Sequence, residues 1–478
     1  MPTAPTTATS PRWAPWALVA VTLLGAALRL PGLAAEEPWF DEAFSLVLAA
    51  QDLPLLLRRA IDDQTNPPGF YLLLWGWTHL GGLELAWSRL LPALAGTATI
   101  PAVALAARAL GLGPPAALVA ALLAATSPLL LAMSSELRAY APLALVATLA
   151  LAAVAAGRPR AFALAALALV ALHYFGALVV AALVVGALWH DRALGRRCLV
   201  AALPAAAALG AWLLVVAREA GDRGVGGNAA WIRAPGLGDL SSFTSQVVGT
   251  FGTRAGAYAV LATLLAAMLV AARGARRPGS GLAPAHGGGP AGTDRPGALR
   301  LLLAAAIVPV LATLALALGT GRGLWVARYL IIVLPPLWLL LADAATRAPR
   351  RARAALVATL AAWATLAGPL AEAQRTKRTA WSLVARALTA GGPRVVCTNE
   401  PFVGLPLLYQ AVRARLPLTV RDLGECVRER DADAIVLRDG TEASLRLLDR
   451  AGADVGAPRA LGTRLPETRI RSLRWRAP

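Results

Sequence analysis

Charged residues are scarce in this sequence: they make up 15% of its 478 residues, against 57% for hydrophobic ones. A soluble globular protein covers its surface with polar side chains, and most of this chain lacks the residues to do so. A wholly soluble protein is therefore excluded. Apolar stretches of roughly twenty residues recur instead, each long enough to cross ~30 Å of hydrocarbon as a helix. They are rich in alanine and leucine without period-two alternation, which favours membrane-spanning helices over strands.

Acidic residues and lysine are also few. Lys377 is the only lysine, and 27 Asp and Glu stand against 46 Lys and Arg, which gives a formal net charge of +19. Such a charge can signal nucleic-acid binding, but no RNA- or DNA-binding motif is found. Many of the arginines lie between hydrophobic segments, where basic residues orient a membrane protein. We therefore expect membrane lipids, and no nucleic acid, among the partners.

Cysteine occurs three times. Cys198 begins a hydrophobic run, whereas Cys397 and Cys426 lie in the polar C-terminal region. A disulfide between the last two suits an oxidising compartment, and two unpaired thiols fit the sequence equally well. No CxxC or Cys/His pattern predicts a metal site.

Loop charge orients the apolar segments, because arginine and lysine collect in cytoplasmic loops. Arg12 precedes the first segment and places the N-terminus inside; a cleavable signal peptide is the alternative, which Arg29 within the apolar stretch disfavours. About eleven spans then put the basic loops 157–160, 191–197, 273–277 and 347–353 in the cytoplasm. The predicted spans are 16–33, 89–107, 115–133, 138–157, 161–174, 176–190, 198–217, 256–272, 300–318, 327–346 and 354–370; the pair 161–190 is also compatible with one bent helix.

The segment 67–82 is left out of this count. Its apolar part is about a dozen residues long, too short to cross comfortably, and its aromatic residues are typical of a membrane interface. We expect an interfacial or re-entrant helix within a first outer loop, 34–82. Counting it as a span would move the four basic loops outside.

Two further regions differ in composition from the transmembrane domain, 1–370. The Gly/Pro-rich stretch 273–299 predicts a flexible cytoplasmic linker. Residues 371–478 are polar enough to form a small soluble α/β domain on the outer face. Within it, 394–399 and 433–440 are typical of buried strands, and 405–416 and 441–452 of helices.

Polar residues gather at the predicted outer ends of the spans. Asp41 and Glu42, in WFDEAF, suit a general base or a divalent-cation site; solvated loop acids are the alternative. Glu136 and Arg138, in SSELRAY, are ionisable groups that are costly in a bundle unless paired or functional. Arg138 suits a phosphate, and an ion pair with Glu136 is the alternative.

Two later motifs add basic and aromatic residues. Arg328 and Tyr329 lie at an outer interface where topology needs no basic residue, so an anionic lipid headgroup would explain them; interfacial snorkelling is the alternative. His173, in LHYFGAL, suits either a hydrogen-bonded packing residue or, if it lies close to Glu136 and Asp41, a metal ligand.

The motifs WFDEAF, NPPGFYLLLW, SSELRAY, LHYFG and RYLIIVLPPLWLLL follow one another in this order. With the predicted topology, they resemble the GT-C membrane glycosyltransferases, and more closely the family 39-like proteins related to protein mannosyltransferases, aminoarabinose transferases of lipid A and lipopolysaccharide galacturonosyltransferases. The resemblance covers roughly residues 16–346. It implies an all-α polytopic membrane fold that transfers a sugar from a polyprenyl-phosphate carrier to a lipid, glycan or protein acceptor, outside a bacterial cytoplasmic membrane.

The resemblance also implies roles for single residues. Asp41 matches an essential first-loop aspartate and Glu42 its acidic neighbour. Arg328 and Tyr329 match an Arg-Tyr pair that meets the carrier phosphate. Three residues match a Glu-x-Arg-x-Tyr element, in which the first is catalytic and the others bind phosphate: Glu136, Arg138 and Tyr140.

One position departs from the family pattern. Asn66 stands where relatives usually have His or Lys before the Pro-Pro pair. Asparagine can donate a hydrogen bond to a phosphate oxygen but is a poor transition-metal ligand. A divalent cation at Glu136 and His173, as some relatives use, is therefore left open.

The implied chemistry is a single inverting displacement with Asp41 as general base and the carrier phosphate as leaving group. A multi-pass transporter or lipid flippase is the alternative from another class, although the ionisable residues gather at one face and no internal repeat is detected. A catalytically inactive scaffold relative is a further alternative.

Overall fold

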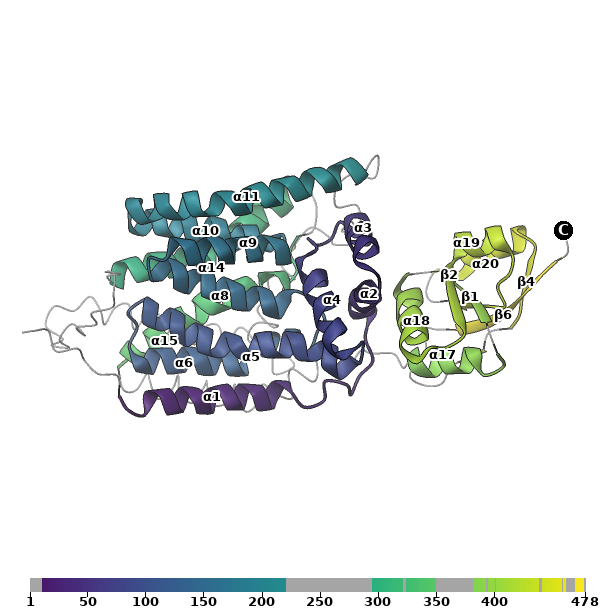
Figure 1. Ribbon diagram of the computed structural model, residues 1–478, viewed down its shortest axis with the longest axis horizontal. Helices are drawn as coiled ribbons and strands as arrows, with labels where there is room; N and C mark the ends of the chain where they lie inside the picture. Colours follow the sequence, from purple (N-terminus) through teal and green to yellow (C-terminus); the bar gives the residue numbers. More distant parts are fainter. Residues whose placement is uncertain are drawn as a thin grey trace, which may run out of the picture. The chain divides into compact units, whose positions relative to one another are not determined.

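The computed structural model describes residues 11–220, 295–320, 324–349, 381–392, 394–399, 401–437, 441–457, 459–460 and 469–476 (Figure 1). The chain divides into two compact units. The first comprises Met1–Pro31, Leu57–Phe70 and Leu90–Arg375, and the second Gly32–Leu56, Tyr71–Arg89 and Thr376–Pro478. Each unit is described separately below.

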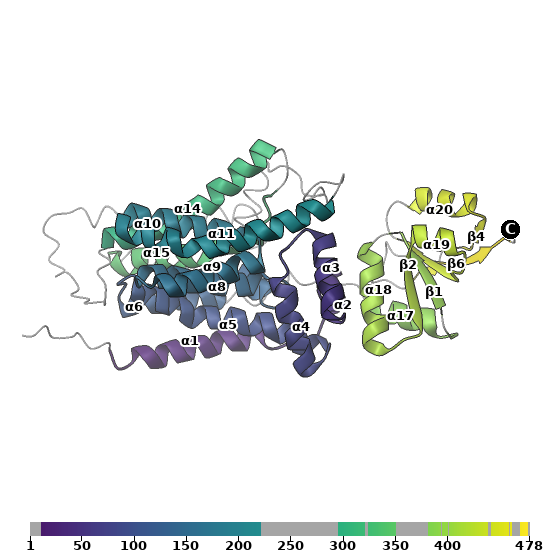
Figure 2. The ribbon, with the colours of Figure 1, turned by 45° about the horizontal axis from the view of Figure 1, so that its top comes forward.

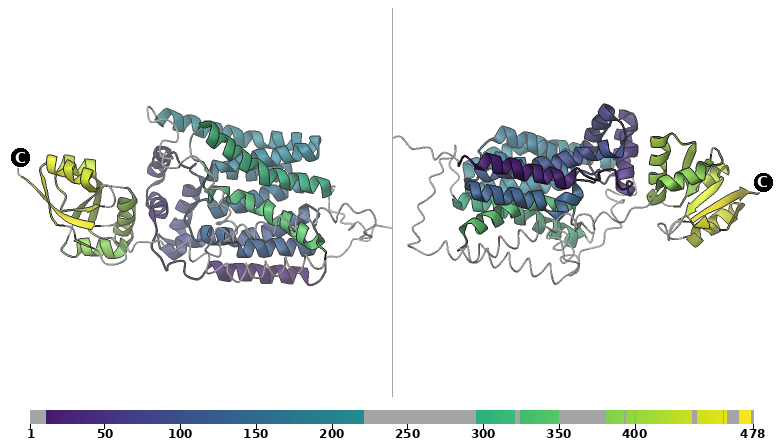
Figure 3. Two further views of the ribbon diagram at one scale, coloured as in Figure 1. Left: turned by 180° about the vertical axis from the view of Figure 1, so that it is seen from behind. Right: turned by 90° about the horizontal axis from the view of Figure 1, so that it is seen from below.

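The first unit is a bundle of apolar helices. Helix α10 packs against α9, α11 and α14, and α6 packs against α1 and α15. Helix α14 also contacts α15, and Figure 3 shows both, in green, on the near side of the bundle in the rear view. The helices are α1 (Ala14–Arg29), α5 (Leu85–Ala109, which belongs to this unit from Leu90 on), α6 (Pro114–Thr126), α7 (Pro128–Met133), α8 (Tyr140–Ala155), α9 (Pro159–Leu172), α10 (Phe175–His190), α11 (Arg192–Ala220), α14 (Arg295–Thr320) and α15 (Leu334–Arg347), the last preceded by the 3-10 turn η3 (Tyr329–Val333).

The prediction of a helical multi-pass membrane protein is confirmed. Four described helices are long and apolar enough to cross a bilayer: Leu85–Ala109, Arg192–Glu219, Arg295–Thr320 and Tyr329–Arg347. Five shorter apolar helices coincide with other predicted spans. The segment 161–190 forms two helices, because His173 adopts an extended conformation between α9 and α10. The count of eleven stays a prediction, since 256–272 and 354–370 lie outside the described residues, as does the linker 273–299 before residue 295, where α14 begins.

The predicted span 115–133 is interrupted, which corrects the expectation of one continuous helix. Ser127 has φ −61° and ψ 117°, because the following Pro128 disfavours the helical conformation. The Ser127 hydroxyl then caps α7 by accepting the Leu130 amide. The break leaves the last carbonyls of α6 without helical donors, and the buried guanidinium of Arg29 donates to two of them, at 2.9 Å each.

The second unit contains part of the first outer loop. Its helices are α2 (Phe40–Ala49), the start of α3 (Leu53–Asp63) and most of α4 (Gly69–Gly81). Helix α4 coincides with the predicted interfacial helix and is ~20 Å long at 1.5 Å per residue, too short to cross the hydrocarbon. Two indoles connect the C-terminal part of α4 to the start of α5: the ring centres of Trp77 and Trp87 stack at 4.6 Å, and each indole N–H donates to the other residue's carbonyl.

The C-terminal part of the second unit is a small α/β domain, as predicted. Strands β1, β2 and β3 are parallel, β6 is antiparallel to β3 and β4, and the order is β2-β1-β3-β6-β4 with β5 beside β6. Figure 2 shows α17 and α18 on one face of the sheet and α19 and α20 on the other. The elements are α17 (Trp381–Thr389), β1 (Arg394–Thr398), α18 (Pro401–Ala414), β2 (Leu418–Asp422), α19 (Leu423–Glu429), β3 (Ala434–Leu437), α20 (Thr441–Arg450), β4 (Ala453–Val455), β5 (Arg459–Ala460) and β6 (Arg469–Trp475).

Alternation along the strands builds a core on each face of this sheet. Val396 of β1 packs with α17 and α18, whereas the next residue, Cys397, packs on the opposite side with α19 and α20. Cys397 forms a disulfide with Cys426 of α19, and both are fully buried. Of the two arrangements that the sequence left open for these cysteines, the structure contains the disulfide.

Candidate active site

A cluster of basic and aromatic side chains lies at one end of the bundle. The basic–aromatic cluster consists of Arg138, Tyr140, His173, Arg328 and Tyr329. The Arg328 Cζ atom lies 5.9 Å from the Tyr140 ring centre and 5.8 Å from that of Tyr329, and the two ring centres are 6.0 Å apart. The charges of Arg138 and Arg328 both act on the His173 imidazole. Three sequence motifs therefore meet here.

Helix ends position each member of the cluster. Arg138 lies in the turn between α7 and α8, and Tyr140 begins α8. His173 occupies the break between α9 and α10, and Arg328 directly precedes the turn that leads into α15. Glu136 is half-buried two residues before Arg138, whose amide donates to its carbonyl at 2.8 Å.

His173 is held in one tautomer. Its Nδ1 atom accepts the Phe175 amide at 3.1 Å, so a neutral ring carries its proton on Nε2. The ring is 3% exposed and its centre lies 5.1 Å from that of Tyr329. Neither nitrogen then has a free lone pair for a metal ion, and two arginine charges act at the same place. This arrangement does not fit a cation bound through His173.

In the part of the chain that the structure describes, no group of three or more His, Cys, Asp or Glu is arranged to hold a metal ion. The basic–aromatic cluster instead supplies cationic and hydrogen-bond-donating groups, which is the chemistry of an anion site.

The loop that carries Asn66 packs beside the His173 break. The Tyr174 hydroxyl donates to the Gln64 carbonyl at 3.3 Å and accepts from the Trp212 indole at 3.0 Å. Gly69 meets the backbone carbonyl of Ala171 so closely that a Cβ atom would clash with it. Gln64 has φ +56°, a conformation that is rare for a residue with a side chain. Asn66 itself is 7% exposed.

Two of the three predicted catalytic acids, Asp41 and Glu42, lie in the second unit, on the first turn of α2, whereas Glu136 belongs to the first unit. Asp41 is half-buried there, and its carbonyl accepts the Ser45 hydroxyl at 2.9 Å. Glu42 is fully buried in a two-pronged ion pair with Arg89, at 2.9 and 2.8 Å. Its carboxylate also accepts the Trp39 amide in a capping box.

Arg89 is a residue that the sequence analysis missed. Beyond Glu42, it donates to the carbonyls of Leu33 and Glu36, at 2.7 and 2.8 Å. It therefore joins the start of the predicted span 89–107 to the chain just before α2. The signal was present in the sequence: topology needs no arginine at the outer end of a span, which is the argument that singled out Arg328.

The C-terminal domain contacts the same loop within the second unit. The Glu37 carboxylate accepts the amide and hydroxyl of Ser382 and the Gln410 side chain. Helix α18 packs against α2, and its Tyr409 hydroxyl donates to the Leu83 carbonyl at 3.3 Å. Burial raises the pKa of the Tyr409 phenol. These contacts hold the segment that bears Asp41.

No protein-family model and no curated protein matches this sequence. Solved structures do match, and they define the fold as that of the GT-C glycosyltransferases. The chain is similar to ArnT from Cupriavidus metallidurans in the apo state, with a TM-score of 0.60, 15% identity, and coverage of 96% of this chain and 97% of that one. ArnT bound to undecaprenyl phosphate matches at 0.57 with 14% identity, over 95% and 97%.

A further match is arabinofuranosyltransferase AftD from Mycobacteria, with a TM-score of 0.55 and 19% identity. It covers 97% of this chain and 40% of AftD, so this chain corresponds to less than half of that protein. The GT-C fold that the motif order led us to expect is therefore confirmed. Identities this low establish the fold alone.

Proposed function

We propose that this protein is a membrane glycosyltransferase that takes a sugar from a polyprenyl-phosphate carrier and transfers it to a hydroxyl-bearing acceptor. The observation that carries the proposal is the basic–aromatic cluster at the helix ends of a GT-C bundle. ArnT, which shares the fold, is a protein seen bound to undecaprenyl phosphate. A phosphate carried on a lipid is the ligand that such a cluster suits best.

Arg138 and Arg328 are the proposed phosphate ligands. Guanidinium groups form charge-assisted, two-pronged bonds to phosphate oxygens. Arginines in an apolar bundle are costly unless a function requires them. In the transfer, the bond between the anomeric carbon and the phosphate oxygen breaks and its electron pair stays on the phosphate. Fixed positive charge stabilises that developing anion, while Tyr140, Tyr329 and Asn66 supply neutral donors.

Asp41 is the proposed general base. It removes the proton of the acceptor hydroxyl as that oxygen forms its bond to the anomeric carbon, on the face opposite the phosphate, so the configuration inverts. Glu42 is better suited to positioning Asp41, since Arg89 and the Trp39 amide occupy its carboxylate.

The disulfide supports an extracytoplasmic location for the C-terminal domain and, with it, for Asp41. Bonds such as Cys397–Cys426 persist in oxidising compartments and are rare in the cytoplasm. The loop-charge topology independently places both regions outside. We propose the outer face of a bacterial cytoplasmic membrane as the site of transfer.

The proposal is tested with the purified full chain in lipid nanodiscs. Radiolabelled polyprenyl-phosphate sugars are offered with lipid, glycan and peptide acceptors, and transfer is measured. We expect Asp41→Asn to lower the rate by about 10²–10⁴-fold and Arg328→Gln by about 10²–10³-fold. Arg108→Gln, an exposed arginine in the last turn of α5, is the matched control and should leave the rate unchanged.

Binding of unglycosylated polyprenyl phosphate supplies a second readout that does not depend on finding the sugar. Arg328→Gln should weaken it, and Asp41→Asn should not. Transfer that survives Asp41→Asn would refute the role of Asp41. Tight carrier binding with no transfer across the whole panel would favour the flippase or scaffold alternatives.

A further inference from the structure

His173 carries a hydrogen-bond donor that the fold does not use. The Phe175 amide donates to Nδ1 at 3.1 Å, so the proton of the neutral ring is fixed on Nε2. In the part of the chain that the structure describes, this Nε2–H group donates to no carbonyl and to no other side chain. The residue is 3% exposed, so water scarcely reaches the ring. Because buried donors are normally paired, we expect a ligand to supply the acceptor.

The groups around the ring define the charge of that acceptor. The guanidinium charges of Arg138 and Arg328 both act on the imidazole. The ring centres of Tyr140, Phe175 and Tyr329 lie 5.9, 5.5 and 5.1 Å from the imidazole centre. Two cations and three aromatic rings favour an acceptor that brings negative charge.

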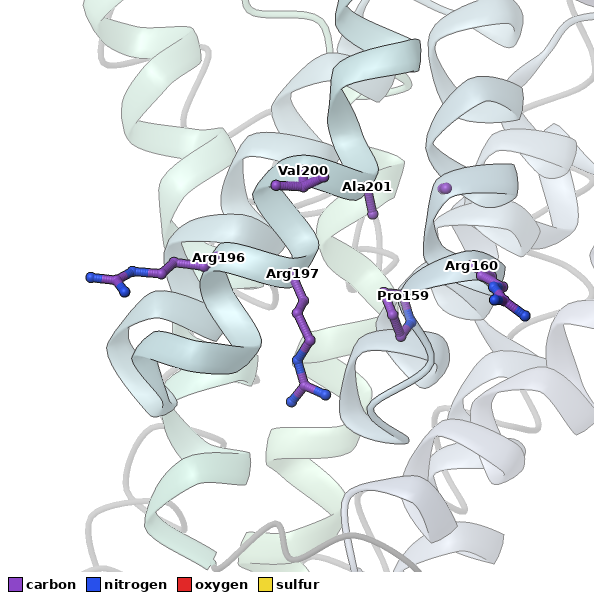
Figure 4. Close-up of a pocket in the computed structure, with 7 residues that line it drawn as sticks. Pro159, Arg160, Arg196, Arg197, Val200 and Ala201 are labelled. Atoms are coloured by element: carbon purple, nitrogen blue, oxygen red, sulfur yellow. The ribbon is translucent and has the colours of Figure 1, made fainter.

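The arginines near the starts of α9 and α11 lack such an arrangement. Arg160, Arg196 and Arg197 line a pocket there, and Figure 4 shows their side chains extending in different directions. All three are exposed. Exposed guanidinium groups that diverge do not surround one anion, whereas the two arginine charges at His173 act on one buried ring.

We propose that the Nε2–H group of His173 donates a hydrogen bond to a phosphate oxygen of the polyprenyl carrier, with no metal ion between them. The proposal rests on the proposed function and adds a neutral imidazole to the two guanidinium groups that hold the phosphate. His173 keeps its proton, because a ring protonated on both nitrogens would lose the bond from the Phe175 amide. It is therefore a donor to the leaving phosphate, and this bond strengthens as negative charge develops there.

The direct test measures whether this nitrogen and the carrier phosphorus are neighbours. The full chain is labelled with ¹⁵N-histidine, held in a detergent without phosphorus, and loaded with unglycosylated polyprenyl phosphate. Solid-state NMR then measures the dipolar coupling between ¹⁵N and ³¹P. The chain has four histidines, so the signal missing from His173→Phe identifies this residue. We expect a coupling at Nε2 that corresponds to roughly 4 Å, as one N–H···O bond followed by a P–O bond requires.

Carrier binding by the variants supplies a second readout. His173→Phe keeps an aromatic ring and removes the donor, so binding should weaken about 10–100-fold, as expected for a hydrogen bond to a charged group. His173→Gln places an amide N–H near the lost donor and should recover most of the affinity. His79→Phe, which replaces an exposed histidine of α4, is the matched control and should leave binding unchanged. The thermal midpoint of each variant without carrier verifies that it folds.

Three results would overturn the proposal. The first is carrier binding without ¹⁵N–³¹P coupling at His173. The second is an equal loss of affinity in His173→Phe and His173→Gln, which would show a packing role. The third is carrier binding that a chelator abolishes and Zn²⁺ restores, since His173 would then be a metal ligand. A wild-type chain that binds no carrier would instead refute the proposed function, so the two failures are distinguishable.

Discussion

Replacing Arg89 with methionine removes the cation beside Glu42 and the four hydrogen bonds that the guanidinium donates. Glu42 is 0% exposed, so its carboxylate loses this counter-charge where water does not reach it. Removing one partner of a buried ion pair costs about 3–5 kcal/mol. Two carbonyls also lose a donor, at ~1 kcal/mol each. We therefore expect the free energy of opening α2 to fall by about 5–7 kcal/mol.

Hydrogen exchange of the full chain in nanodiscs measures this opening locally, which avoids assuming that the two units unfold together. Amides in the segment 40–49 should exchange at least about a thousandfold faster in Arg89→Met, since each 1.4 kcal/mol is tenfold. Arg108→Met is the control and should leave them unchanged.

The double variant Glu42→Leu/Arg89→Met gives the sharper outcome. This variant lacks the buried Glu42 carboxylate. Its amides in the segment 40–49 should therefore exchange more slowly than those of Arg89→Met, because replacing both members of a buried pair costs less than removing one. Two results would refute the view that this pair holds α2. One is unchanged exchange in Arg89→Met. The other is a loss of protection in the double variant equal to the sum of the losses in Arg89→Met and in Glu42→Leu alone.

Three further outcomes are expected. Gly69→Ala should destabilise the protein by about 1–3 kcal/mol through its clash with the α9 backbone, whereas Gly76→Ala in the same helix meets open space and should be neutral or stabilising in thermal unfolding. Reducing the disulfide between Cys397 and Cys426 should cost ~3.6 kcal/mol for a separation of 29 residues; a double Cys→Ala variant should show no effect of reductant on its thermal midpoint. Because burial raises the pKa of Tyr409, the stability that its neutral phenol contributes is present below pH ~10 and is lost as the pH rises above that value. Tyr409→Phe should lack this loss between pH ~10 and ~11, and an identical loss in both proteins would contradict the reasoning.

Much of the bundle was predictable because apolar length and loop charge are local properties. The break at Ser127 was also readable, since a residue before proline leaves the helical conformation, yet the length of the apolar run concealed it. In the C-terminal domain, strands β1 and β3 are apolar and matched expectation, whereas β2 and β6 carry arginines and were missed.

The pairings within the site were beyond local analysis. The Arg29 side chain donates hydrogen bonds to carbonyls 95 and 96 positions away in the sequence, and Arg89 pairs with Glu42 at a sequence separation of 47 residues. Sequence identifies such groups as costly in an apolar setting but does not name their partners. The cluster around Tyr329 was anticipated through motif order, and the ring contacts that define it came from the structure.

The Glu37–Ser382 contact has a consequence for biosynthesis. Its two residues are 345 positions apart. At a synthesis rate of about 5–20 residues per second, Ser382 is therefore made about 20–70 s after Glu37, and the first loop lacks this contact during that time. The Glu42–Arg89 pair needs only 47 residues and can form early. The loop that bears Asp41 therefore acquires its contacts in two stages. A chain truncated before Trp381 would form the Glu42–Arg89 ion pair but would lack the Glu37–Ser382 hydrogen bonds.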